Sequence, residues 1–184
     1  MYLRVAASFF GRGKLCAQTI KPIDGGYRCR YEAEKGYYRP IGNLHQKEWE
    51  NIDHTQRETV LLQHLCFEAD VFAIGNTITL RIRSDGTADV PFKVEFVFEP
   101  DGIMRTVGTT QPGLPGGYTI TGEPFTYERF GETLRIEGGF HQHEYIDMRG
   151  SEPMPDKAYS VFFTGFTPLD HEITLTVGSA NSSI

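Results

Sequence analysis

Two histidines and a carboxylate near residue 140 are among the residues of this chain that could do chemistry. His141 and His143 are separated by one residue, and Glu144 follows directly. Residues two apart on a β-strand point to the same face, so a strand here would present both imidazoles to one ion. The pattern predicts either a divalent transition-metal site at His141, His143 and Glu144 or, as we prefer, two histidines that bond backbone and solvent without any cofactor.

A second group of candidates lies in residues 34–57, where the regular strand pattern lapses. Exposed aromatic rings stack on sugar faces, and guanidinium groups bind carboxylates. We therefore predict a surface for an acidic carbohydrate, formed by Tyr37, Tyr38, Arg39, Trp49 and His54. His54 beside Asp53 has the composition of a general base near neutral pH, but we favour a salt-bridged loop.

Several function classes are disfavoured by composition and motif. The sequence has no GxSxG nucleophile elbow, P-loop or GxGxxG motif, so neither hydrolase chemistry nor nucleotide binding is indicated. The net charge of -6 argues against general nucleic-acid binding. Three cysteines without CxxC spacing predict free thiols. No apolar run approaches the ~20 residues of a membrane span, and no signal peptide is recognisable. We therefore expect a soluble protein, and the sequence does not specify its compartment.

The elements that must position these residues are strands. Residues 77–83 and 92–98 each alternate apolar and polar side chains, and Asp-Gly pairs follow at 85–86 and 101–102. Such pairs favour hairpin turns, so residues 76–107 are predicted to form a β-meander with one wet face. Residues 59–67 carry apolar side chains on both faces, which predicts a central strand covered on two sides.

The whole pattern predicts one all-β domain. Ten or so short strands with frequent turns indicate a two-sheet antiparallel β-sandwich, similar to a supersandwich. Leu3, Ala6 and Phe9 lie near one face of a helix, and Gly11 and Gly13 follow where a helix would stop. We therefore expect residues 1–13 to be the helical tail of an upstream domain, with Met1 an added start, residues 14–178 to be the sandwich, and residues 179–184 to fray.

The chain resembles the β-sandwich domain that follows the helical (α/α) toroid in heparinase-like polysaccharide lyases. The resemblance rests on segments 10–13, 36–40, 49–54 and 91–98. It implies a non-catalytic accessory module of a larger carbohydrate-active protein, whose partners are an upstream helical domain of the same polypeptide and an acidic polysaccharide. The alternatives are a self-contained cupin-like, metal-dependent enzyme or sugar-binding protein centred on His141, His143 and Glu144, and a purely structural interaction domain.

Overall fold

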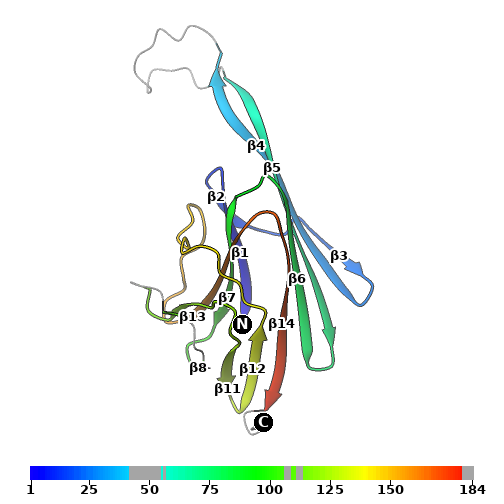
Figure 1. Ribbon diagram of the computed structural model, residues 1–184, viewed down its shortest axis with the longest axis vertical. Coiled ribbons are helices and arrows are strands. Elements are labelled where there is room, and N and C mark those ends of the chain that lie inside the picture. Colours follow the sequence, from blue (N-terminus) through cyan, green and yellow to red (C-terminus); the bar gives the residue numbers. More distant parts are fainter. Residues whose placement is uncertain (42–54, 56, 106–108, 111–113, 180–184) are drawn as a thin grey trace.

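The structure is a computed structural model that describes residues 1–41, 55, 57–105, 109–110 and 114–179. Its described residues form fourteen strands in two sheets (Figure 1). Nowhere in these residues is there a helix that could cross a membrane. The predicted all-β sandwich is thereby confirmed.

Both sheets are almost wholly antiparallel. The six-stranded sheet has the order β2 (Arg12–Leu15), β1 (Tyr2–Phe9), β7 (Pro91–Phe98), β13 (Tyr159–Phe166), β10 (Gly117–Thr119) and β9 (Thr109–Thr110). The eight-stranded sheet has the order β3 (Thr19–Ile23), β4 (Gly26–Pro40), β5 (Arg57–Ile74), β6 (Thr77–Gly86), β14 (Leu169–Ser179), β12 (Glu132–Glu137), β11 (Phe125–Arg129) and β8 (Ile103–Arg105). Among these pairings, only that of β10 with β13 is parallel.

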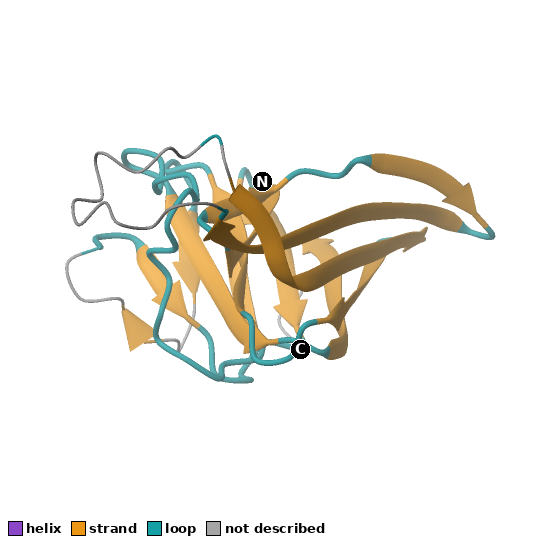
Figure 2. Ribbon diagram, turned by 90° about the horizontal axis from the view of Figure 1, so that it is seen from above, coloured by secondary structure: helices purple, strands orange, loops and turns teal. Residues whose placement is uncertain are grey.

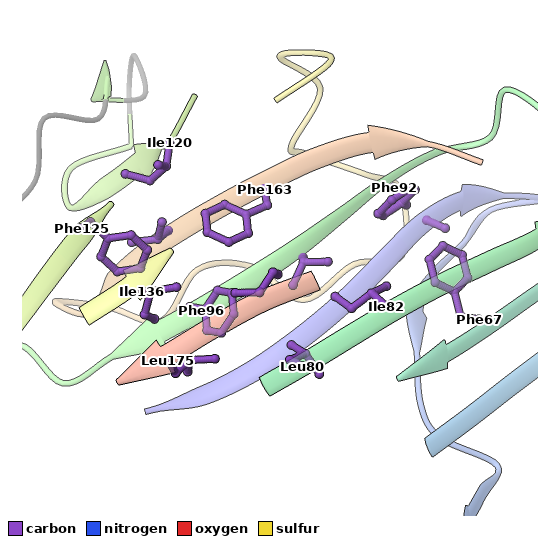
Figure 3. Packing of buried hydrophobic residues seen from close by; sticks show 14 of the residues in the cluster. Phe67, Leu80, Ile82, Phe92, Phe96, Ile120, Phe125, Ile136, Phe163 and Leu175 are labelled. Carbon is purple, nitrogen blue, oxygen red and sulfur yellow. The ribbon is translucent and has the colours of Figure 1, made fainter. Parts of the chain in front are cut away.

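The core is a layer of aromatic and aliphatic side chains between the two sheets (Figure 3). Phe92 and Phe96 lie on one face of β7 because successive strand residues alternate in direction. The Phe92 ring meets Phe67 of β5 at 5.1 Å between centroids, and Phe96 meets Phe163 of β13 at 5.4 Å. Truncating one such buried ring to alanine typically costs about 3–5 kcal/mol.

The predicted meander over residues 76–107 is wrong, because β6 and β7 belong to different sheets. The link between them crosses the sandwich edge and is held by Thr167. The Val90 amide donates to Thr167 Oγ1 at 3.0 Å, and that hydroxyl donates to the Thr87 carbonyl at 2.6 Å. Alternation thus identified the strands correctly but not their partners.

The predicted helix over residues 1–13 is also wrong, since Tyr2–Phe9 is strand β1 and pairs with β7. Leu3, Val5 and Ala7 pack against the core between the sheets, whereas Ala6 is buried on the opposite face. A strand with apolar residues on both faces does not show simple alternation, and this explains the error.

Residues 138–158, here called the covering segment, first run beside β13 at residues 140–142 and then cross the outer face of the six-stranded sheet, where they meet β1 and β2. Met148 is fully buried there, and the Lys14 amide donates to the Gly150 carbonyl at 3.1 Å. Apart from one bridge between His141 and Thr164, the segment has no strand structure. The expectation that His141 and His143 share a strand face is therefore wrong.

The two longest strands continue past the sandwich body as a two-stranded arm (Figure 1). Pairing with β3 ends at Arg30, and pairing with β6 ends at Leu65, so among the described strands residues 35–40 and 57–63 pair only with each other. We call these residues the β4–β5 arm. Residues 35–40, expected to be irregular, are thus strand, and residues 59–63, expected to be covered on two faces, belong to this arm.

Candidate functional site

The β4–β5 arm carries three of the five predicted carbohydrate-binding residues. Tyr37 and Tyr38 are each 59% exposed, and Arg39 follows them on the same strand. Their rings point to opposite faces because adjacent strand residues alternate. Trp49 and His54, the other two predicted residues, lie outside the described residues, so their relation to the tyrosines stays a prediction.

A bulge interrupts the register of the arm just before the tyrosines. The register shifts between Lys35 and Tyr37, and Leu61 on the opposite strand has a positive φ of 52°. Gly36 is needed here, because a Cβ at this position would stand 2.7 Å from the Val60 carbonyl oxygen. Bulges often re-aim side chains.

Each tyrosine already has a neighbour on one side. The Arg57 guanidinium lies 4.0 Å from the centre of the Tyr38 ring, a cation–π contact. Tyr37 packs edge-on against Phe10, with 5.1 Å between centroids. Arg39 is paired with Glu58, so a carboxylate ligand would have to compete with Glu58 for it.

Aliphatic side chains accompany the aromatic ones on the arm. Leu61 is 71% exposed, and Leu62 is exposed as well. Large apolar side chains gathered on a projecting element are typical of a surface that contacts another molecule. The arm therefore offers a mixed apolar, aromatic and cationic surface.

His141 uses both ring nitrogens within the protein. Thr164 Oγ1 donates to the His143 carbonyl at 2.6 Å, so it accepts from His141 Nδ1 at 2.9 Å. His141 Nε2 lies 2.9 Å from Glu144 Oε1. A metal ion could therefore bind either nitrogen only by displacing Thr164 or Glu144 from it.

The His143 side chain has different hydrogen-bond partners from those of His141. Its Nε2 donates to the Gly165 carbonyl at 3.0 Å, and its buried Nδ1 has no hydrogen-bond partner in the described chain. A metal-ligating imidazole often bonds a carbonyl in this way, but one ligand does not make a site. No three His, Cys, Asp or Glu residues gather around a possible metal position within the residues described.

The outer face of the eight-stranded sheet carries a ladder of charged pairs. Arg28 donates to both carboxylate oxygens of buried Asp70, at 2.6 and 2.8 Å, and Arg83 adds a bond of 2.7 Å. These bonds, with that from Arg28 the strongest cause, lower the pKa of Asp70 below its ordinary value. Such matched pairs stabilise the sheet and leave little uncompensated charge to bind a ligand.

A second charged group lies on the outer face of the six-stranded sheet, beneath the covering segment. Glu95 accepts from Arg4 Nε at 3.1 Å and Nη2 at 2.5 Å, and from Ser160 Oγ at 2.8 Å. Lys93 Nζ lies 3.7 Å from Glu95 and 5.2 Å from the Phe162 ring centre. Burial lowers the pKa of Lys93, although the charge of Glu95 opposes this.

A cleft of about 640 Å³ opens between the two sheets at the β1 edge. Leu3, Val5 and Leu15 line one wall, and Tyr31, Ala69 and Val71 line the other. The sequence analysis missed it, because the two walls come from strands far apart in the chain. Alternation marks these side chains as inward-facing but does not show that the sheets fail to close over them.

Comparisons with known proteins add no assignment. Neither the family models nor the curated proteins match this sequence, and no solved structure matches the fold.

Proposed function

We propose that this chain is a non-catalytic β-sandwich module that acts by binding, with the β4–β5 arm as its docking element. The observation that carries the proposal is the arm itself, whose two strands have no further strand partner in the described part of the chain and which exposes Tyr37, Tyr38, Leu61 and Leu62. A two-stranded hairpin is at best marginally stable alone in water. Burial of these side chains against a partner would stabilise it by about 25 cal/mol per Å² of apolar surface removed from water.

The partner that we propose is a protein domain. Leu61 and Leu62 are aliphatic, and such side chains gain most from an apolar protein surface, whereas sugar rings favour aromatic faces. The sequence resemblance to the sandwich domain of heparinase-like lyases supports a helical domain of a carbohydrate-active protein as this surface. The internal bonding of His141, His143 and Glu144 supports a role without catalysis.

The docking proposal is tested by photo-crosslinking from the arm. A benzoylphenylalanine at Leu61 in the full-length gene product is expected to crosslink to a protein domain in the cell of origin. The same probe at Ile74, which is 80% exposed at the other end of β5, should not. The captured domain, once purified, should bind the chain at least tenfold more weakly after Leu61→Ser and Leu62→Ser, but not after Ile74→Ser. Equal crosslinking from both positions would refute the role of the arm.

Contact with acidic glycan is a second candidate function, favoured by two exposed tyrosines beside Arg39 and Arg57. An array of acidic glycans should then show binding that Tyr38→Ala abolishes. Tyr27→Ala is the matched control, because Tyr27 is equally exposed and lies at the other end of β4. Binding that both variants leave unchanged, or no binding to any glycan, would rule this candidate out.

A further inference from the structure

The cleft between the sheets meets an unpaired strand edge. On one side, β7 pairs with β1 from Tyr2 to Ala7, but on the other side β2 pairs only from Val5 to Phe9. Within the described chain, residues 2–4 therefore have no strand neighbour along the edge that borders the cleft. Such an edge presents backbone N–H and C=O groups that can pair with another strand.

The chain itself leaves this position open. After Leu15 it crosses from the six-stranded to the eight-stranded sheet, where the Gln18 amide donates to the Arg30 carbonyl at 2.8 Å. The Gln18 side chain is bonded to the Glu32 backbone at 2.8 and 2.9 Å. This crossing is thus fixed on β4, away from residues 2–4 of β1.

The opposite wall continues as an uncovered apolar sheet face. Ile20 of β3 and Tyr27 of β4 are 66% and 59% exposed, and they lie beside Cys29 and Val71 in the register. In Figure 1, β3 and the adjoining ends of β4 and β5 extend away from β1 and β7, and Figure 2 shows strands reaching past the body in the same way. The eight-stranded sheet therefore has inner surface that the six-stranded sheet does not cover.

We infer that an extended segment of another polypeptide adds to the six-stranded sheet along residues 2–4 and inserts alternate apolar side chains into the cleft. A small apolar molecule would fill the cleft but leave the edge groups unpaired, and a helix would bury them without bonds. A strand satisfies both, because its backbone pairs with the edge while every second side chain points to one face.

The inference is independent of the proposed role of the arm, since the cleft is lined by residues 29–31 of β4 and the arm comprises residues 35–40 and 57–63. The probe is a synthetic nine-residue peptide, Lys-Val-Thr-Val-Thr-Val-Thr-Val-Lys. Its control has the same composition with the four valines consecutive. In calorimetric titration the alternating peptide should bind at least tenfold more tightly, and hydrogen exchange of the Leu3 amide, which faces the open side of β1, should slow in the complex.

Two variants locate the binding site of the peptide. Ala69→Trp places a large ring in the cleft and should weaken binding at least tenfold. Ile74→Trp, at the exposed end of the same strand, should leave the affinity unchanged.

A fused strand keeps the inference testable if Ala69→Trp fails to fold. The alternating sequence, joined ahead of Met1 by an Asn-Gly turn, can pair only on the open side of β1, because β7 occupies the other. It should raise the Tm above that of the same fusion with the block sequence.

Four results would overturn the inference. The first is equal affinity for both peptides, and the second is binding without protection of the Leu3 amide. The third is a homodimer that Ala69→Trp converts to monomer, which would assign the cleft to a second copy. The last is absence of peptide binding together with no gain in Tm for the fused strand.

Discussion

The buried carboxylate of Glu95 shows how strongly a single charged residue depends on its partners. Glu95 is 1% exposed, yet Arg4, Lys93 and Ser160 surround its carboxylate. Removing one partner of a buried ion pair is strongly destabilising, whereas replacing the charge by an apolar side chain of similar size is often neutral. The change in stability caused by a substitution in this cluster therefore depends on which member is replaced.

Glu95→Gln should lower the free energy of unfolding by about 3–5 kcal/mol, because it removes the carboxylate that Lys93 and Arg4 share and leaves Arg4 with only the longer ion pair with Glu152, at 3.5 Å. Lys93→Met should change it by less than about 1.5 kcal/mol, since the thioether retains packing on Phe162 and Glu95 keeps Arg4. Urea titrations of both variants provide the measurement. Equal losses would show that Lys93 is as necessary to the cluster as Glu95.

Comparison of the parent protein with Lys93→Met isolates the contribution of Lys93 to the pH dependence of stability. Because the pKa of Lys93 is lowered by burial, the unfolded chain binds this proton more tightly than the folded chain. The free energy of unfolding should therefore rise with pH between the folded pKa and the ordinary value of 10.5. Lys93→Met should lack this contribution, which is read as the difference between the two stability curves.

At the scale of elements, the eight-stranded sheet is joined by cross-strand charges in addition to its core. Asp70 on β5 binds Arg28 on β4 and Arg83 on β6, so one carboxylate connects three neighbouring strands. Its lowered pKa means that its stabilising effect is present above the ordinary value of 3.8 and is lost as pH falls through the folded pKa.

Asp70→Asn should lower the free energy of unfolding by about 1–3 kcal/mol at neutral pH, as expected for lost bonds to charged groups. The difference from the parent protein should shrink on acidification below pH 3.8. Asp170→Asn is the control, because Asp170 pairs with Arg81 at an exposed position and should matter less. A constant difference at all pH values would contradict the assignment to Asp70.

The sequence predicted the positions of several strands correctly but not the strands that pair with them. Alternation over residues 77–83 and 92–98 predicted β6 and β7 correctly, because one buried face imposes a period of two. The same pattern does not specify the partner of a strand, so it missed the crossing that Thr167 holds between them. Burial of Ala6 on the face opposite the core obscured the alternation in β1.

Some features of the candidate sites could be predicted from the sequence, and others could not. Exposure of Tyr37 and Tyr38 was predictable, because nothing in their local sequence offered an apolar face to cover them. The cleft was not, because it depends on how far one sheet extends beyond the other. The spacing of His141 and His143 suggested a shared face, but the covering segment is not a strand, and their side chains bond different groups.

For the whole molecule, strands late in the sequence lie inside both sheets. β13 lies between β7 and β10, and β14 lies between β6 and β12. Neither sheet is continuous without them.

A chain ending at residue 158, which lacks β13 and β14, should show no cooperative thermal unfolding in near-ultraviolet circular dichroism. A chain ending at residue 179 retains every described strand and is the control expected to fold. A sharp transition in the shorter chain would mean that the earlier strands form a stable unit by themselves.

The sheet order has a further consequence while the protein is being made. Synthesis proceeds from the N-terminus, so the aromatic face of β7 leaves the ribosome well before β13 exists, although the two strands are neighbours in the finished sheet. Until then the nascent chain exposes hydrophobic strands, because each sheet still lacks an interior strand, β13 in one and β14 in the other. Holding chaperones should therefore engage this polypeptide during translation, and release should coincide with emergence of its last two strands.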